Sequence, residues 1–444
     1  MKVLLCGGGN AIHVLSSFIG SKPDCDVSIL TLFAGEAGRL SDALPEEGIK
    51  CENDLGPDTY GKPVAISDDP AEVTPGSDIV IFAIPSFGHQ LYLEALKPHL
   101  KPGVILGAMP GEGGFDLCAR HVLGDDFVNK SNLFALETLP WACRITEYGK
   151  SVEVLGTKKE IDVVITPKGG ESIDPALKLL QKLVGKEPIM EPACNFLGVT
   201  LMNINSVWHP TISYGYYRNK DVTKHMDEPP LFYQGADEYT GEKLAKVSDE
   251  VLELKRVLLE KYSGLDLSSV HHVREWMLRS YGDDIGDTSS IHKMLLTNKG
   301  YRGLTHPTVA VDTPEGKKYL PNFKYRYFSE DIPMGLMVTR GIAELAGVPT
   351  PHMDDVILWC QEMMGKEFLK DGKVAGKDLA STRAPQLYGF NDLDSFMKAN
   401  RYVEASASED KQESRKQQYR SKRTSSSLSE NSCTLGRESF GYSQ

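Results

Sequence analysis

Three consecutive glycines near the start of the chain have the residue types and spacing that bind a pyrophosphate. Gly7, Gly8 and Gly9 follow a short apolar run and precede a helical pattern. In such a turn the first glycine permits a sharp bend, the second lets backbone N–H groups approach the phosphates, and the helix N-terminus adds partial positive charge. The pattern predicts a dinucleotide site, with a purely structural turn as the alternative. The residues expected to form it are Gly7, Gly8, Gly9, Asn10 and Ala11.

Two features depart from the usual dinucleotide fingerprint. Ile12 stands where a third Gly or Ala normally lets helix and strand pack closely. The second expected strand ends at residues 31–33 without an acidic residue for the ribose, whereas Glu36 comes a few residues late and Arg39 follows it. The residues alone therefore leave the choice between NAD and NADP open.

Histidines are the next candidates for chemistry. Imidazole titrates near neutrality, so His209 can accept and return a proton, although a lone histidine beside Pro210 also suits a structural role. His271 and Glu275 stand four residues apart, as metal ligands on a helix can, with His272 between them. No further ligand pattern joins them, so we expect a solvated polar face and no metal.

The elements that must position these residues fall into two patterns. In the first part of the chain, near-continuous apolar runs alternate with helical patterns, which is typical of a parallel sheet covered on both faces. The expected strands are 3–6, 27–33, 79–84, 104–107 and 133–136, with 152–155 and 163–166 extending the same sheet. The expected helices there include 11–20 and one that closes near residue 185.

Beyond Pro192 helical patterns dominate. Ser248 is the expected N-cap of a helix that runs to Tyr262, and two more helices are expected over 334–345 and 356–363. We therefore expect an α/β fold with three parts: a Rossmann-type parallel-sheet domain, a mainly helical domain, and a disordered tail in which Ser, Gln, Lys and Arg dominate. Their expected bounds are 1–196, 197–403 and 404–444.

The overall composition excludes several classes of function. A 41% hydrophobic and 25% charged composition is that of a folded globular protein. The formal net charge of -12 argues against a nucleic-acid binder and against binding to an anionic membrane surface. No apolar run approaches the length of a membrane span, and no signal core precedes the glycines. The eight cysteines lack CxxC pairs, so we expect reduced thiols and a cytoplasmic protein.

Several sequence blocks together resemble the octopine dehydrogenase family of opine dehydrogenases, from residue 2 to about residue 395. The blocks are CGGGNAIH, LTLFAGEA, LETLPWACRI, VEVLGTKK, WHPTISYG, EPPLFYQG, SEDIPMG and QLYGFNDLD. The resemblance implies a Rossmann domain followed by a helical domain, with the amino acid bound between them. It also implies a monomeric enzyme that condenses a 2-oxo acid, usually pyruvate, with an amino acid. NADH reduces the resulting imine, which regenerates NAD when oxygen is short.

The resemblance also implies roles for particular residues. His209 matches the family's catalytic histidine, and Asp331 matches the carboxylate that orients it, although Asp331 before Pro333 also suits a helix N-cap. Arg326 matches a substrate-binding arginine, with a surface salt bridge as the alternative. The remaining expected substrate-binding residues are Thr138 and Glu137, with Trp276 as an aromatic wall that has core packing as its alternative.

Two positions depart from the family's pocket. The family has a glutamine where this chain has Glu112, and a methionine near the catalytic histidine where this chain has Asn203. A carboxylate at Glu112 would repel pyruvate unless it is protonated or turned towards a cation. We therefore take an NADH-dependent opine dehydrogenase of unspecified amino-acid preference as the main hypothesis. A simple 2-oxo or hydroxy acid dehydrogenase and a non-catalytic dinucleotide-binding protein are the alternatives.

Overall fold

An eight-stranded sheet forms the core of the first half of the chain in a computed structural model that describes residues 1–193 and 195–403. The strand order is β12-β11-β8-β7-β6-β1-β2-β5. All neighbouring strands run parallel except β11, which is antiparallel to β8. The strands are β1 (Lys2–Cys6), β2 (Asp26–Leu30), β5 (Ala65–Ser67), β6 (Ile79–Phe82), β7 (Ile105–Ala108), β8 (Asn132–Leu136), β11 (Glu160–Ile165) and β12 (Ile189–Ala193). The expected Rossmann-type sheet is thus confirmed.

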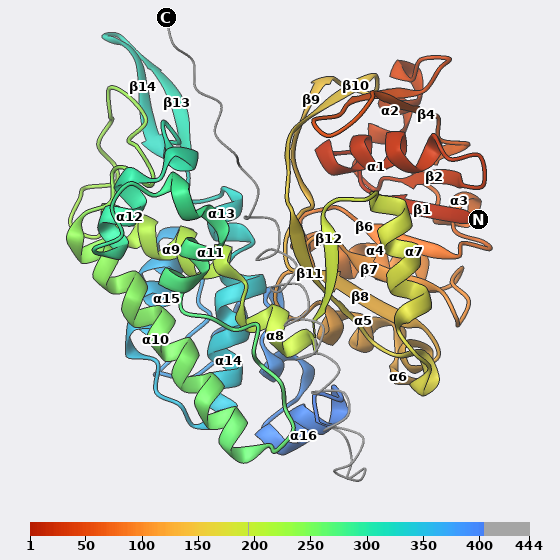
Figure 1. The fold of residues 1–444 in the computed structure, drawn as a ribbon. Coiled ribbons are helices and arrows are strands. Elements are labelled where there is room, and N and C mark those ends of the chain that lie inside the picture. The colour runs from red at the N-terminus through yellow and green to blue at the C-terminus, as the bar shows by residue number, and fades with distance from the viewer. Residues whose placement is uncertain (194, 404–444) are drawn as a thin grey trace, which may run out of the picture.

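Helices cover both faces of this sheet because its strands are apolar on both sides (Figure 1). On one face, α1 (Asn10–Gly20) and α7 (Asp174–Val184) pack on Val3 and Leu5. On the other face, α4 (His89–Leu96) and α5 (Phe115–Leu123) pack on Leu4 and Cys6. The shorter helices of this half are α2 (Glu36–Ala43), α3 (Pro70–Val73) and α6 (Asp125–Asn129).

The chain order of the strands reverses between β1 and β6. From β1 the sheet extends one way through β2 and the other way through β6 and β7, with Cys6 paired to both Leu30 and Phe82. The carboxyl ends of these strands therefore meet at one edge. Ligands of open parallel sheets bind at such a reversal, and the glycine turn begins there.

The expectation that residues 152–155 extend the main sheet is wrong. They belong to β10 (Ser151–Thr157), which forms a separate four-stranded sheet of order β4-β3-β10-β9. The other strands of that sheet are β3 (Ile49–Glu52), β4 (Thr59–Gly61) and β9 (Trp141–Glu147). An apolar alternation predicts a strand but does not identify its partner, and here β10 pairs antiparallel with β9.

The second half of the described chain is mainly helical, as expected, with one two-stranded hairpin (Figure 1). Its helices are α8 (Phe196–Leu201), α9 (Ile204–Tyr217), α10 (Glu238–Lys261), α11 (Val273–Tyr281), α12 (Ile291–Thr297), α13 (Arg326–Ser329), α14 (Met337–Ala346), α15 (Pro351–Met364) and α16 (Leu393–Ala399). The hairpin pairs β13 (Thr308–Thr313) with β14 (Gly316–Pro321). The short helical turns of the described residues are η1 (Ser86–Gly88), η2 (Lys168–Gly170), η3 (Gly282–Asp284), η4 (Lys299–Tyr301), η5 (Ile332–Leu336), η6 (Leu379–Ser381) and η7 (Pro385–Tyr388).

One expected helix detail is wrong. Ser248 lies inside α10, where its hydroxyl accepts from the backbone N–H of Val273, and the N-cap is Asp237, eleven positions earlier. The helix expected over 334–345 is present as α14, with the π-helical turn η5 directly before it. The expected disordered tail lies outside the described residues. Among the described residues, no helix has both the length and the apolar character needed to cross a bilayer.

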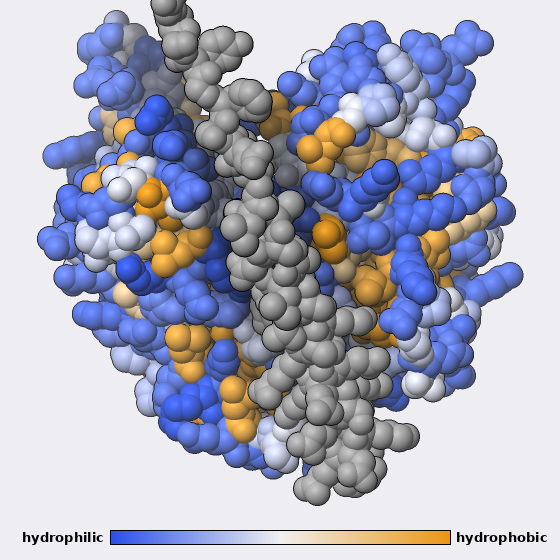
Figure 2. Space-filling model, in the orientation of Figure 1, coloured by the Kyte–Doolittle hydropathy of each residue, from blue (hydrophilic) through white to orange (hydrophobic). Residues whose placement is uncertain are grey.

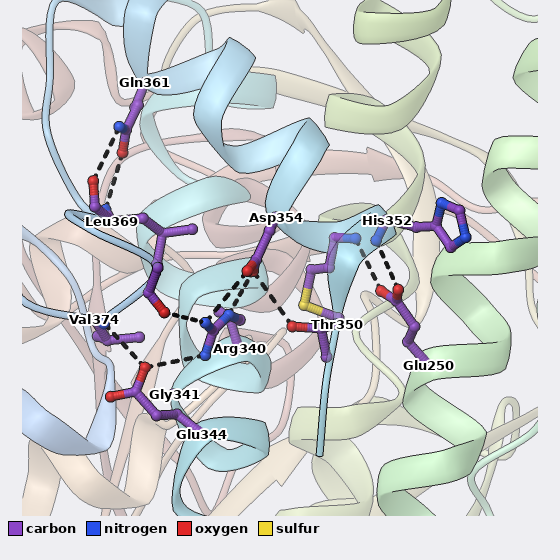
Figure 3. A network of polar contacts seen from close by, with 12 residues as sticks. Glu250, Arg340, Gly341, Glu344, Thr350, His352, Asp354, Gln361, Leu369 and Val374 are labelled. Carbon is purple, nitrogen blue, oxygen red and sulfur yellow. Dashed lines mark hydrogen bonds and ion pairs between the residues drawn. The ribbon is translucent and has the colours of Figure 1, made fainter. Parts of the chain in front are cut away.

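A buried ionic network joins the long helices of the second half (Figure 3). Arg340 in α14 donates to Asp354 at 2.5 Å, to Glu344 at 3.1 Å and to the carbonyl of Gly372 at 2.9 Å. Glu250 in α10 accepts from the first backbone N–H groups of α15. Both side chains satisfy groups that would otherwise be buried without partners.

Replacing Arg340 with alanine should destabilise the protein by about 3–5 kcal/mol, because the substitution removes a buried cation and leaves the half-buried carboxylates of Asp354 and Glu344 without it. Chemical denaturation measures this loss. The matched control is Arg256→Ala, since Arg256 pairs with Glu253 and Glu260 but its side chain is 53% exposed. The control should change the unfolding midpoint little. Equal effects of the two variants would contradict the prediction.

Candidate active site

The glycine turn has the geometry that close approach of a phosphate needs. Gly7 has a φ of +119°, and a Cβ there would lie 2.6 Å from Cγ2 of Ile84, so only glycine fits. Gly9 is the N-cap of α1 and offers no side chain to the first N–H groups of the helix. Those groups are therefore available to an anion. A dinucleotide fits this cradle.

Asn10 and Ile12, in the first turn of the helix after the glycines, both have defined contacts. Asn10 accepts from the backbone N–H of Ile145 in β9, so its side chain ties α1 to the second sheet. Ile12 is fully buried, and its Cγ1 would be 3.5 Å from a Cβ on Gly7, which is ordinary contact. The larger residue is therefore accommodated without widening the turn.

Glu36 reaches the end of β2, although the sequence places it a few residues too late. Thr31 Oγ1 donates to Glu36 Oε2, and a Cβ on Gly8 would lie 2.5 Å from the carboxyl carbon of Glu36. Gly35, with a φ of +70°, starts α2 and turns the chain back towards β2. This carboxylate lies where it can accept from ribose hydroxyls. The sequence signal that could have identified this position of Glu36 is the glycine directly before it, Gly35, which permits a tight turn.

His209 and Asp331 form a buried ion pair in the helical half. His209 lies in α9, and its Nδ1 is 2.6 Å from Oδ2 of Asp331, which precedes η5. The ring of Tyr327 stacks on the imidazole at 3.6 Å and 11°. Among the described residues nothing bonds to Nε2, so the second nitrogen is left for a substrate. Asp331 stands at the N-cap position of η5, but its side chain makes no cap hydrogen bond there, so its carboxylate is engaged by His209 and not by the helix end.

The electrostatics of this pair suit a carboxylate that orients the imidazole and stabilises its protonated form. Burial raises the pKa of Asp331, and the neighbouring imidazole opposes that rise. A carboxylate bonded to Nδ1 keeps that nitrogen protonated and leaves Nε2 to accept and return a proton. The geometry therefore suits general acid–base chemistry at Nε2.

Glu330, which sequence reasoning missed, links Arg326 to the dinucleotide-binding half. Its Oε2 accepts from Nε of Arg326 at 2.5 Å, and its Oε1 accepts from the N–H and hydroxyl of Ser86, at 2.6 and 2.9 Å. Ser86 follows β6 at the ligand-binding edge of the sheet. The terminal nitrogens of Arg326 make no hydrogen bond with any described residue, so they are free to hold a carboxylate.

The other expected pocket residues lie on both halves. Trp276 in α11 donates from Nε1 to Oε1 of Glu137, at 3.3 Å, and contacts Trp208 edge-on at 5.6 Å. Burial raises the pKa of Glu137. Thr138, just past β8, is half-buried, and its side chain makes no hydrogen bond within the described chain. The structure therefore brings Trp276 and Glu137 together but gives Thr138 no direct partner.

The two departures from the family's pocket contact each other. Asn203, the N-cap of α9, donates from Nδ2 to Oε2 of Glu112 at 2.6 Å. Glu112 is 8% exposed, and burial raises its pKa to about 8, with Asp331 and Glu330 adding to the rise. The sequence marks both positions as unusual, but it contains no sign that they pair.

The histidines considered as metal ligands have other partners. His271 Nδ1 lies 3.3 Å from Glu275, and His272 caps α11. Within residues 1–193 and 195–403, no three His, Cys, Asp or Glu side chains gather as a metal site would require.

Comparison with known proteins identifies the family. Residues 192–364 match the model for the α-helical domain of NAD/NADP octopine/nopaline dehydrogenases. A tauropine dehydrogenase from Arabella iricolor is 41% identical, covering 88% of this chain and 99% of that protein. An octopine dehydrogenase from Mizuhopecten yessoensis is 40% identical, covering 89% and 98%.

Solved structures agree with the sequence comparison. An octopine dehydrogenase with NADH and L-arginine has a TM-score of 0.83 and 38% identity, covering 92% of this chain and all of the other. The same enzyme with NADH and pyruvate has a TM-score of 0.80 over the same shares. The chain belongs to the opine dehydrogenase family.

Proposed function

We propose that this chain is an NADH-dependent opine dehydrogenase that joins pyruvate to the amino group of an amino acid. The observation that carries the proposal is the chain of contacts through residues 330 and 331. Asp331 holds His209, while Glu330 holds Arg326 and reaches Ser86 beside the dinucleotide cradle. An acid–base group and an anion-binding group are thereby fixed against the cofactor-binding half. Relatives named tauropine and octopine dehydrogenase and structures titled with NADH support the same activity.

The residues of the site account for each requirement of a reductive condensation. Nε2 of His209 accepts a proton from the substrate ammonium, so that a neutral amine attacks the carbonyl carbon. The same nitrogen returns the proton to the carbinolamine hydroxyl, which leaves as water and gives the imine. Arg326 holds a substrate carboxylate. NADH, when bound at the glycine turn, supplies the hydride that reduces the imine carbon. The balance is pyruvate, amino acid, NADH and a proton giving opine, NAD and water.

We further propose a monomeric cytoplasmic protein. The six cysteines of the described residues are unpaired, which fits a reducing compartment. Blue hydrophilic side chains dominate the face drawn in Figure 2, and hydrophobic residues lie there in scattered small groups. Size-exclusion chromatography with light scattering tests the oligomeric state.

The activity itself is tested by NADH oxidation with pyruvate and a panel of amino acids. Arginine, alanine, glycine and taurine are the first amino donors to compare, and NADPH replaces NADH in a parallel series. Oxidation that requires both pyruvate and an amino acid supports the proposal. Oxidation with pyruvate alone, unaffected by amino acids, indicates a simple 2-oxo acid dehydrogenase. NADH binding without turnover across the panel indicates a non-catalytic protein.

His209→Ala should lower kcat by roughly 10²–10⁴-fold, the range for a lost general acid–base. Asp331→Asn is the companion variant, because it keeps the shape but removes the charge that holds Nδ1 protonated. Steady-state kinetics should show a folded, poorly active Asp331→Asn enzyme with an unchanged thermal midpoint. Near-normal kcat for either variant would remove that residue from the mechanism.

Arg326→Lys should raise KM for pyruvate roughly 10- to 100-fold, since a lysine cannot replace two parallel charge-assisted hydrogen bonds. The exposed Arg256→Lys is the control for the same change of residue type. If KM for pyruvate and for the amino acid both stay at their normal values, Arg326 does not bind substrate.

Glu36→Gln should reduce the preference for NADH over NADPH roughly 10- to 100-fold, because a carboxylate accepts from ribose hydroxyls and repels a 2′-phosphate. The ratio of kcat/KM for the two cofactors measures the effect. Asp42→Asn, an exposed acid on the same helix, should leave the ratio unchanged. An unaltered ratio for Glu36→Gln would show that its carboxylate does not face the ribose.

A further inference from the structure

The loop between β7 and α5 is fixed against the helical half by three contacts. Asn203 donates to Glu112, Thr200 Oγ1 accepts from the N–H of Gly114 at 3.1 Å, and Arg383 donates to the carbonyl of Gly113 at 3.4 Å. Glu112 has a φ of 54°, a conformation that costs a non-glycine residue free energy. The loop therefore holds its one carboxyl group at a defined place between the two halves.

The hydrogen bonds of Asn203 determine which oxygen of Glu112 accepts. Oδ1 of Asn203 caps α9 by accepting from the N–H of Ser206, so its amide NH₂ is the group that faces Glu112. An NH₂ group can only donate, and Oε2 of Glu112 is therefore an acceptor. Oε1 has no hydrogen-bond partner among the described residues, so a proton on this carboxyl resides on Oε1.

The charges around Glu112 disfavour its ionised form. Asp331 and Glu330 lie near it from the segment before η5, and their negative charges oppose a third. Arg326 is the cation that faces the same group, but its Nε is engaged by Glu330, while His209 is engaged by Asp331. Burial is the largest cause that raises the pKa of Glu112, to about 8. Burial and the two neighbouring carboxylates therefore favour the protonated form of this carboxyl at neutral pH.

We propose that Glu112 acts as a neutral carboxylic acid whose Oε1–H donates a hydrogen bond to the carboxylate of the 2-oxo acid substrate. Asn203 is the positioning residue that keeps Oε2 as the acceptor. This inference rests on the proposed function, because it concerns the substrate of that same site. A protonated glutamic acid presents one acceptor and one donor, as a glutamine side chain does. The difference is that the donor of Glu112 disappears when the proton leaves.

The sign of the pH dependence follows from this donor. Below about pH 8 the neutral acid binds the anionic substrate, and above that pH a carboxylate faces another carboxylate. A bound anion stabilises the protonated form further. Affinity for the substrate should therefore fall up to about tenfold for each pH unit above the pKa of the free enzyme.

Oxamate, a non-reducible analogue of pyruvate, tests the inference without turnover. Its Kd for the enzyme–NADH complex is measured by calorimetry from about pH 6 to about pH 9.5. In the unmodified protein Kd should rise above about pH 8, whereas Glu112→Gln should bind with similar affinity at neutral pH and lose most of the alkaline rise. Asn203→Ala should weaken binding at neutral pH but keep the rise.

Glu250→Gln is the matched control, because burial also raises the pKa of Glu250, to about 7, outside the site. It should leave the oxamate profile unchanged. Infrared difference spectra between neutral and alkaline pH provide the second readout. A protonated-carboxyl C=O band that titrates near pH 8 should be lost in Glu112→Gln and retained in Glu250→Gln.

Several results would overturn the inference. They are an alkaline rise in Kd that persists unchanged in Glu112→Gln, tighter oxamate binding at alkaline pH, or no protonated band assigned to Glu112. The second result would mean that ionisation of Glu112 does not oppose binding of the anion. Failure of the unmodified protein to bind oxamate also overturns it. The NADH-oxidation panel decides separately whether the proposed function stands.

Discussion

Burial of the Glu330 carboxylate between the two halves is the constraint on which the site depends. A buried carboxylate needs partners, and those of Glu330 come from both sides: Arg326 in the helical half and Ser86 at the edge of the parallel sheet. Separating the halves would leave this charge without its backbone donor. The site for chemistry thus exists only where the halves meet, which suits a reaction between a bound cofactor and substrates held by the other half.

Close backbone packing then brings the acid–base pair together. A Cβ on Gly335 would lie 2.3 Å from Cβ of Ser206, so η5 rests directly on the first turn of α9. Next to this contact, Asp331 stands directly before η5 and His209 lies further along α9. Oδ2 of Asp331 is therefore 2.6 Å from Nδ1 of His209. A side chain at residue 335 would force the two segments apart. Glycine there positions the pair without touching it.

The sequence predicted the features that local residues determine, such as turns and strands. It failed for the features that depend on which distant segments come into contact. The glycine turn and the Rossmann sheet follow from apolar runs and from a backbone that only glycine permits. Strand β10 was assigned to the wrong sheet because alternation does not name a partner. The residues around Asp331 also suited a helix cap, since only the fold brings the imidazole within reach. Glu36 was discounted by its spacing, because the turn at Gly35 that returns it to β2 is a property of backbone geometry.

The pairing of Glu112 with Asn203 explains why two unusual residues can occupy one pocket. Alone, the buried carboxyl of Glu112 would lack a hydrogen-bond donor, and the half-buried amide NH₂ of Asn203 would lack an acceptor. Together they satisfy each other across the boundary. The raised pKa also has a consequence for stability: the folded chain retains this proton between the ordinary value of 4.5 and about 8, whereas the unfolded chain has released it. The contribution of Glu112 to the free energy of unfolding therefore falls as pH rises through that interval, and it stays constant above about pH 8, where both states are ionised.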